Sequence, residues 1–237
     1  MPSPVDNLTD ALLGPILAAD SAGPRVTYYD DASGERIELS ASTLMNWAAK
    51  TANMMVDEFA LDPGAKVAVL LPAHWQSVAV LLGVWWAGCE VVLSPDSDAE
   101  LAFVTEDRLG DVTDVPEVAA LSLDAFGKGL SGLPIGVADY ATSIRVHGDQ
   151  FRSAGAGSAL EGRSVAETIS AAKESSTARE LTSADRVLSS RPWDSAQELI
   201  DGLLSVFAAG ASLVQVAHPD AETTARRVST EKITKQF

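Results

Sequence analysis

The sequence predicts an α/β protein with layered, mostly parallel sheets and flanking helices, and three neighbouring segments lead to this prediction. "AKVAVLLP" (65–72) is an uninterrupted apolar run, which is typical of a strand buried on both faces of a parallel sheet. "AHWQSVAVLLGVWWAG" (73–88) predicts a helix that is apolar nearly all round, and "CEVVLSP" (89–95) predicts a second buried strand. Strand, helix and strand in this order form the crossover unit of a parallel sheet.

The N-terminal part predicts a helix, a hairpin and a second helix. "NLTDALLGPILAAD" (7–20) is typical of a helix with its cap near Asn7 or Thr9. "RVTYYDDASGERIELS" (25–40) predicts two short strands around a Ser-Gly turn, a small antiparallel unit. From Ser40 or Ser42 onward, apolar residues recur at helical spacing, so this helix buries one face.

The remaining elements continue the α/β pattern. Two strand segments are expected within 100–109 and 117–127, and a Gly/Pro-rich stretch (126–137) separates them from the second half. The second half predicts a helix at 165–175, a strand at 185–190, a helix at 195–209, a strand at 211–217 and a helix at 220–230. Because there is no internal repeat or long linker, we expect one domain over 1–237, with candidate sub-lobes 1–133 and 134–237.

Composition limits the classes of partner. The chain has 237 residues, of which 46% are hydrophobic and 21% charged, enough for a substantial core. Its net charge of −16 repels nucleic-acid phosphates and anionic lipid, so neither nucleic acid nor a membrane is expected as a partner. An anionic ligand would need local N–H groups, a helix N-terminus or Mg²⁺.

The single cysteine and the N-terminus point to the cytoplasm. Cys89 excludes an intrachain disulfide and a cysteine metal cluster, and we expect it to be a buried packing residue. The start "MPSPVDNLTDALLG" lacks the basic and apolar regions of a secretory signal, and no apolar stretch reaches the roughly 18 residues that a membrane span needs. We therefore expect a soluble cytoplasmic protein.

A glycine-rich stretch, "FRSAGAGSALEGRS" (151–164), is the main candidate site. Its residues of interest are Ser153, Gly155, Gly157, Ser158, Gly162, Arg163 and Ser164. Residues 157–164 match the phosphate-binding pattern G-x-x-x-x-G-K-[ST] except that arginine replaces lysine, and the preceding "RVHGDQF" is polar and short. The favoured interpretation is a loop that caps the next helix through Ser158 or Ser164. A weak anion site at that helix N-terminus, formed by glycine N–H groups and Arg163, is the other interpretation.

Other motifs carry less chemistry. The G-x-G-x-x-G pattern at 127–132 is followed by Pro134 where a helix would be needed, so it predicts a surface loop. His74 follows a strand at the edge where α/β ligands bind, so it is a candidate pocket-edge residue, although a role in helix initiation or packing is favoured. His147 and His218 are isolated, and neither G-x-S-x-G nor HExxH occurs. The sequence thus predicts no catalytic residue, no metal ligand and no cofactor.

Four segments carry a resemblance to a known family. They are "TYYD…IELSASTLMNWAAKTANMM", "LDPGAKVAVLLPAHWQSVAVLLGVWWAGCEVVLSP", "FVTEDRL" and "LTSADRVLSSRPWDSAQELIDGLLSVFAAGASLVQV". In order and pattern they resemble the N-terminal part of the adenylate-forming, AMP-binding superfamily, which includes acyl-CoA synthetases. More closely, the chain is similar to small uncharacterised actinobacterial proteins that are remote relatives of these enzymes. The resemblance implies the fold of the N-terminal part of an AMP-binding domain.

The same resemblance implies altered chemistry. The family's phosphate loop is a Tyr-Thr-Ser-Gly-Thr-Thr-Gly-x-Pro-Lys-Gly stretch; here Ser153 and Gly157 can be aligned with it, but Gly155 and Ala156 replace the threonines and Leu160 replaces the lysine. The later family motifs and the C-terminal lid domain with its catalytic lysine are expected to be absent. This predicts a non-catalytic remnant that acts as a partner-binding or regulatory module, with a second copy or another protein covering its exposed surface. The alternative is a protein that binds a nucleotide, CoA or an acyl group near His74 and the 153–164 loop without adenylation activity.

Overall fold

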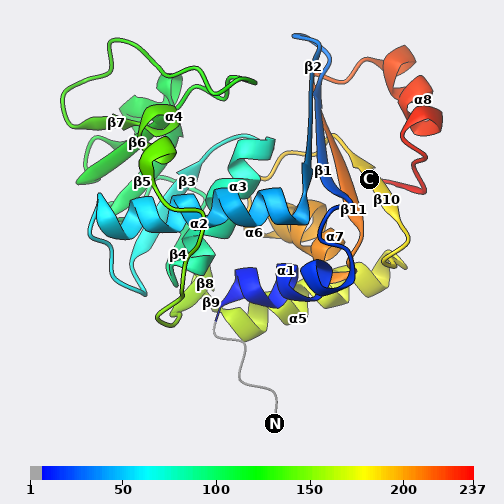
Figure 1. Ribbon diagram of the computed structural model, residues 1–237, viewed down its shortest axis with the longest axis horizontal. Coiled ribbons are helices and arrows are strands. Elements are labelled where there is room, and N and C mark those ends of the chain that lie inside the picture. Colours follow the sequence, from blue (N-terminus) through cyan, green and yellow to red (C-terminus); the bar gives the residue numbers. More distant parts are fainter. Residues whose placement is uncertain (1–6) are drawn as a thin grey trace.

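The computed structural model describes residues 7–237, which form a five-stranded and a seven-stranded sheet with helices between and around them (Figure 1). The five-stranded sheet has the order β12-β10-β11-β1-β2, and the seven-stranded sheet has the order β7-β6-β5-β3-β4-β8-β9. Only the pairs β1–β2 and β8–β9 are antiparallel, so the predicted mostly parallel α/β class is confirmed for this part of the chain.

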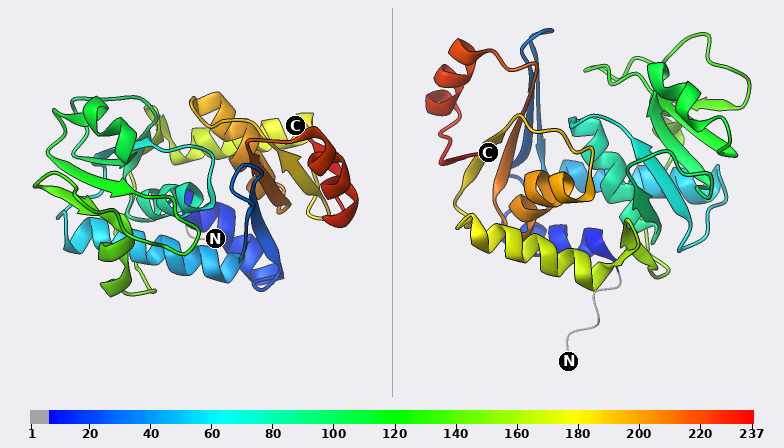
Figure 2. Two further views of the ribbon diagram at one scale, coloured as in Figure 1. Left: turned by 90° about the horizontal axis from the view of Figure 1, so that it is seen from above. Right: turned by 180° about the vertical axis from the view of Figure 1, so that it is seen from behind.

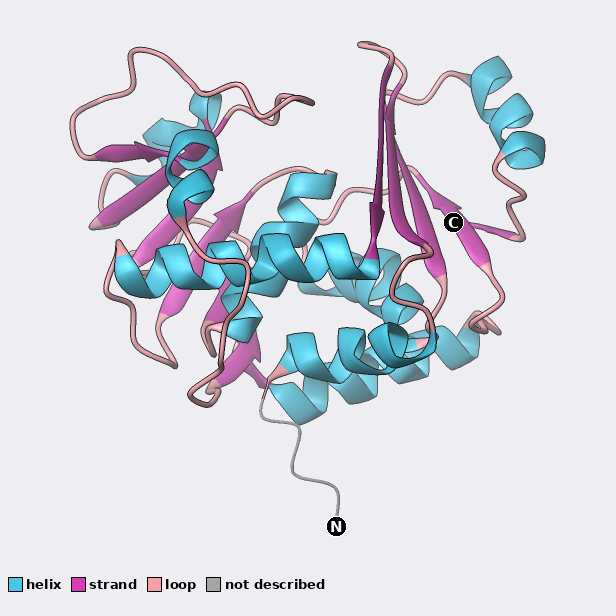
Figure 3. Cartoon of the chain, in the orientation of Figure 1, coloured by secondary structure: helices cyan, strands magenta, loops and turns pink. Residues whose placement is uncertain are grey.

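The strands are β1 (Pro24–Asp30), β2 (Glu35–Ser40), β3 (Lys66–Leu70), β4 (Glu90–Val92), β5 (Leu101–Thr105), β6 (Glu117–Leu121), β7 (Val137–Asp139), β8 (Ser158–Leu160), β9 (Arg163–Ser164), β10 (Arg186–Ser189), β11 (Ser212–Ala217) and β12 (Lys235–Gln236). The α-helices are α1 (Leu8–Ala19), α2 (Ala41–Asp57), α3 (Trp75–Trp86), α4 (Tyr140–Ser143), α5 (Val165–Ala178), α6 (Ala196–Leu199), α7 (Ser205–Ala208) and α8 (Ala221–Thr230). Two 3₁₀ segments, η1 (Glu106–Val112) and η2 (Ile144–Val146), and a π segment, η3 (Ile200–Leu204), complete the described part of the chain (Figure 3).

In the N-terminal part, the structure contains the helix caps and the hairpin that the local sequence predicts. Asn7 and Ser40 accept hydrogen bonds from the backbone N–H groups of Asp10 and Thr43, and so cap α1 and α2. Strands β1 and β2 pair in an antiparallel hairpin, as the Ser-Gly turn predicts. The hairpin does not stand alone, because β1 also pairs in parallel with β11 near the other end of the chain.

The core lies where the helices meet both sheets. Every residue of α3 is buried, which confirms the prediction of a helix that is apolar nearly all round. Alternate residues of β3 divide between the two faces of its sheet: Val67 and Val69 join the core beneath α2 and α3, and Ala68 and Leu70 face a smaller cluster that includes Val112 of η1. Cys89 is 2% exposed, so its predicted packing role is confirmed.

The two sheets and their surrounding helices join parts of the chain that lie far apart in sequence. Each sheet takes strands from both sides of residue 133. Helix α8 covers the outer face of the five-stranded sheet, whereas α5 runs beneath the molecule from the β8–β9 hairpin toward β10 (Figures 1 and 2). No helix within residues 7–237 is long and apolar enough to cross a membrane.

One prediction was wrong in detail. The stretch 151–164 was expected to be a loop throughout, but residues 158–160 and 163–164 form strands β8 and β9. The reason is tertiary, because β8 is too short to be predicted from its own residues and forms by pairing in parallel with β4.

Candidate functional site

His74 lies where the chain passes from β3 into α3. Its Nδ1 accepts a hydrogen bond from the backbone N–H of Gln76 at 3.1 Å, so the imidazole caps α3 and the favoured helix-initiation role is confirmed. The residue is 3% exposed and packs edge-on against Tyr28, with ring centroids 4.3 Å apart. Burial lowers the pKa of His74 to about 3, against a smaller opposing effect of Asp30. The imidazole is therefore neutral near pH 7.

Glu35 and Trp75 complete the surroundings of His74. The Nε2 atom of His74 is 3.8 Å from the nearest Glu35 oxygen and has no hydrogen-bond partner within residues 7–237. Trp75 Nε1 donates to that same oxygen at 3.1 Å. Burial raises the pKa of Glu35, although the bond from Trp75 acts to lower it. Because the neutral imidazole is enclosed, the geometry supports capping and packing rather than proton transfer to a bound molecule.

The β8–β9 hairpin occupies the place where the sequence suggested a phosphate loop. Its connection consists of two residues, Glu161 and Gly162, with φ values of 48° and 76°. Two consecutive residues in the left-handed region characterise the tight type I′ turn. The hairpin therefore leaves no extended loop between its strands to wrap around a phosphate.

Side-chain carboxylates of the chain itself accept hydrogen bonds from two backbone N–H groups around this turn. The N–H of Gly162 donates to Glu90 Oε1 at 2.5 Å, and the N–H of Leu93, just past β4, donates to Glu161 Oε1 at 2.7 Å. These two backbone donors are therefore already paired with carboxylates of the chain.

The start of α5 is closed in the same way. Ser164 is the N-cap of a capping box: its hydroxyl accepts the backbone N–H of Glu167 at 3.3 Å, and its own backbone N–H donates to the Glu167 carboxylate at 2.8 Å. The Ser164 hydroxyl also donates to that carboxylate at 2.7 Å. The two bonds that Ser164 donates to the carboxylate lower the pKa of Glu167, and Arg163 contributes to the same shift through its charge. The carboxylate of Glu167 therefore lies at the helix N-terminus, where the sequence suggested a weak anion site.

The glycines before β8 serve close packing. Gly157 donates its N–H to the carbonyl of Gly88 at 3.4 Å, and a Cβ on Gly157 would lie 3.1 Å from the Cα of Gly64. A Cβ on Gly88, where φ is +81°, would overlap the carbonyl oxygen of Gly155. The hydroxyl of Ser153 makes its hydrogen bonds with Gly155. The glycine content here follows from backbones that cross at short range.

The candidate residues divide between two edges of the seven-stranded sheet. Ser153, Gly155 and Gly157 contact or adjoin the segments that precede β3 and β4, at the amino ends of these strands. The turn at 161–162, Arg163 and Ser164 lie at the carboxyl end of β4, and His74 follows the carboxyl end of β3. Ser158 lies on β8 between the two edges. The structure therefore does not gather the seven loop residues into one cradle.

Sequence reasoning missed the acids that close the site. Glu167 could have been found, because Ser164-x-x-Glu167 is the sequence pattern of a capping box. Glu90 gives no such signal: it lies 72 residues from Gly162 in the chain and is placed only by the pairing of β4 with β8.

Comparison with known proteins places the chain in a family. A TIGR03089 family protein of Mycobacterium tuberculosis is 55% identical in an alignment 236 residues long, which covers 96% of this chain and 97% of that protein. The chain belongs to the TIGR03089 family. A comparison with models of protein families found no match.

Solved structures show the same fold in larger proteins. An acyl-CoA synthetase of Brucella canis matches with a TM-score of 0.77 and 17% identity, over 97% of this chain and 46% of that one. An anthranilate CoA ligase, crystallised with anthranoyl-AMP, matches with a TM-score of 0.72 and 15% identity, over 97% and 49%. A benzoate CoA ligase of Burkholderia xenovorans matches with 0.69 and 15%, over 94% and 48%. The chain thus has the fold of a part of these ligases and spans about half of their length.

Proposed function

We propose that this protein is a non-catalytic member of the adenylate-forming fold that acts by binding a partner protein. The observation that carries the first half of the proposal is the closed β8–β9 hairpin. In the family's phosphate loop, hydroxyls, N–H groups and a lysine hold the phosphates; here Glu90 accepts the Gly162 N–H, and Glu167 accepts the N–H and hydroxyl of Ser164. A triphosphate would have to displace these bonds.

Charge opposes such a displacement. Glu90, Glu161 and Glu167 surround the hairpin, and Arg163 is the one cation within the hairpin itself, residues 158–164. Phosphoryl and adenylyl transfer depend on positioning and neutralising phosphate charge. A site with an excess of carboxylates, in a chain with a net charge of −16, repels phosphate instead of neutralising its charge.

Exposed apolar side chains support the second half of the proposal. Within residues 7–237, Phe126 is 94% exposed, Ile135 107% and Val146 83%. Phe126 also lines a pocket of about 190 Å³ together with Trp47 and Trp75. This volume is below the roughly 300–1,000 Å³ of small-molecule sites, so it fits an inserted side chain of a protein better.

Two measurements test the absence of catalysis. We expect no pyrophosphate exchange into ATP with any of a panel of carboxylic acids, because the phosphates find no open donors. In a thermal-shift screen with ATP and Mg²⁺, AMP, CoA and acyl-CoAs, a ligand at 100 times its Kd would add about 2.7 kcal/mol, and we expect no such shift from the nucleotides. ATP consumption that depends on a carboxylic acid would refute the proposal.

A matched pair of variants tests the partner surface. Phe126→Asp places a charge on the exposed aromatic, and Val56→Asp places one on α2 at a residue that is 41% exposed. We expect a protein captured by the wild type to be lost from Phe126→Asp and retained by Val56→Asp, and light scattering to show whether that protein is a second copy. If the wild type and both variants capture the partner equally, the surface around Phe126 is not the partner-binding surface.

A further inference from the structure

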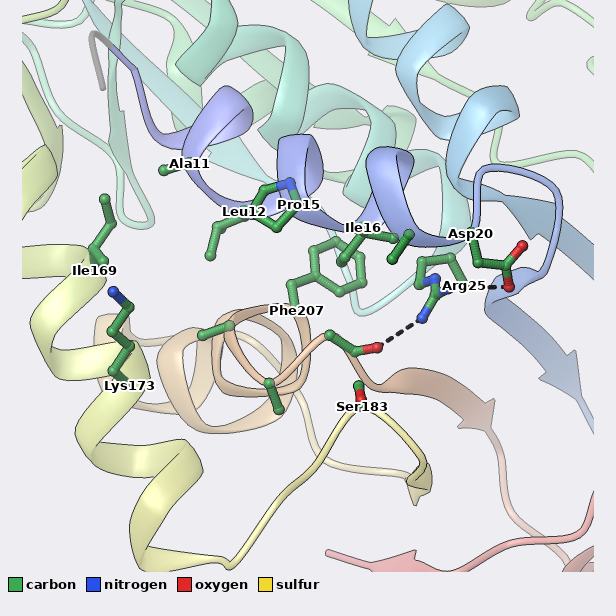
Figure 4. A pocket seen from close by; sticks show the side chains of 14 residues that line it. Ala11, Leu12, Pro15, Ile16, Asp20, Arg25, Ile169, Lys173, Ser183 and Phe207 are labelled. Atoms are coloured by element: carbon green, nitrogen blue, oxygen red, sulfur yellow. Dashed lines mark hydrogen bonds and ion pairs between the residues drawn. The ribbon is translucent and has the colours of Figure 1, made fainter. Parts of the chain in front are cut away.

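A second cavity shares no lining residue with the surroundings of His74. It has a volume of about 540 Å³, is open to solvent on one side and is lined by α1, α5 and the end of α7 (Figure 4). Arg25 at the start of β1, Ser183 before β10 and Gly210 before β11 also line it. The cavity is therefore at the amino ends of the five-stranded sheet, separate from the candidate site described above.

The walls of this cavity are mostly apolar, and the small side chains among them explain why the space between the helices is not filled. Leu12 and Ile16 of α1 and Phe207 of α7 are at most 4% exposed and form the floor. Around them, the lining residues of α1 and of the α7 end include several alanines, whose small side chains leave space between the helices. A volume of this size is within the range of small-molecule sites, and its walls suit an apolar body.

A buried cation lies at one end of the cavity. Arg25 is 7% exposed; its Nη1 donates to the carbonyl of Gly210 at 2.8 Å, and its Nη2 is 3.5 Å from Asp20, whose side chain is 56% exposed. The Nε of Arg25 has no hydrogen-bond partner within residues 7–237. The charge of Arg25 is therefore only partly compensated by the chain, which is costly for a buried guanidinium.

A second cation lies at the other end. Lys173 of α5 lines the cavity opposite Arg25 (Figure 4), and it forms no ion pair with any acid of the described part of the chain. Lys173 is exposed, whereas Arg25 is buried, and Asp20 also lines the cavity at the Arg25 end. Two cations at the ends of an apolar cavity are complementary to an anion that also has an apolar body.

We propose that this cavity binds a small apolar carboxylate, with the carboxylate at the Arg25 end and the apolar body along α1 over Leu12, Ile16 and Phe207. A monoanion fits better than a phosphate, because each additional negative charge is repelled by the net charge of −16. Arginine suits this role, since its planar guanidinium matches the geometry of a carboxylate. The proposal is independent of the partner surface around Phe126.

Calorimetric titration with octanoate, with uncharged 1-octanol as the comparison ligand, tests the proposal. Adjacent alanines at the end of α1 provide a matched pair: Ala19 lines the cavity and Ala18 does not, and both are exposed. We expect Ala19→Phe to weaken octanoate binding at least tenfold and Ala18→Phe to leave it unchanged. Arg25→Gln should also weaken it at least tenfold, because a charged hydrogen-bonding partner is lost.

Each contrary result overturns a stated part of the proposal. The absence of octanoate binding at millimolar concentration would refute it altogether. Equal affinities for octanoate and 1-octanol would refute recognition of the carboxylate, and unchanged binding to Ala19→Phe would place the ligand elsewhere. If Arg25→Gln does not fold, the alanine pair and the comparison of the two ligands still decide the question.

Discussion

His74 should make the stability of the protein depend on pH, and the substitution His74→Asn tests this. Asparagine is a good helix N-cap, so the variant keeps a group that can accept the N–H of Gln76, but it removes the titrating imidazole. The variant also loses packing against Tyr28, which lowers stability at every pH. The informative quantity is therefore the difference between two pH values, not the stability at one.

The size and sign of this effect follow from the burial of the imidazole. The pKa of His74 is about 3 in the folded protein and 6.5 as a free side chain. Below pH 6.5 the unfolded chain binds a proton that the folded protein excludes, so folding stability falls as pH decreases from that point toward 3. At pH 5.0 the loss is about 2 kcal/mol, since each pKa unit corresponds to about 1.36 kcal/mol.

Urea unfolding at pH 7.5 and pH 5.0 measures this contribution. We expect the wild type to lose about 2 kcal/mol more than His74→Asn between the two pH values, because all other groups are shared. Glu35 is the exception, since it lies next to His74 and its own pKa is raised; repeating the comparison in a Glu35→Gln background removes its titration. Identical pH dependences for the wild type and His74→Asn would show that the imidazole is not held neutral.

Two further predictions concern the packing of the sheets. Arg227→Met should destabilise the protein by about 3 kcal/mol in urea unfolding. The reason is that the buried carboxylate of Asp31, which lies 2.5 Å from the guanidinium, loses its partner. As a control, Arg226→Met on the exposed side of α8 should change stability by less than about 0.5 kcal/mol. Gly88→Ala should lower the free energy of unfolding by about 3 kcal/mol, since the new Cβ combines a positive φ with overlap against the glycine-rich segment. Gly132→Ala has the same φ of +81° but nothing within 4 Å of its Cβ, so it should lower that free energy by only about 1 kcal/mol. Equal losses at the two glycines, or a neutral Arg227→Met, would contradict the packing described.

The chain's own carboxylates satisfy backbone donors at the β8–β9 hairpin and at the start of α5. The pairing of β8 with β4 and the start of α5 position these N–H groups. Their acceptors are the side-chain carboxylates of Glu90 and Glu167. Buried or helix-terminal donors need an acceptor in any case, so a carboxylate from the chain satisfies them when no ligand does.

The sequence by itself determined the elements whose causes are local. The apolar run at 65–72 and the all-round apolar helix at 73–88 predicted β3 and α3, because hydrophobic periodicity reports burial directly. Each helix cap was narrowed to two candidates for the same reason, since a cap involves residues within one turn, and the structure selects Asn7 over Thr9, Ser40 over Ser42 and Ser164 over Ser158.

Only the tertiary structure decided which distant residues meet. Gly157 could be aligned with the family's phosphate loop, yet it and Gly155 pack against Gly64 and Gly88 because β8 pairs with β4 and so carries them to the amino edge of the sheet. The meeting of Arg25 with Lys173 around one cavity likewise depends on how α5 packs beneath α1. The physical reason is that caps and periodic patterns act over a few residues, whereas strand order and cavities arise from packing among segments that the sequence leaves far apart.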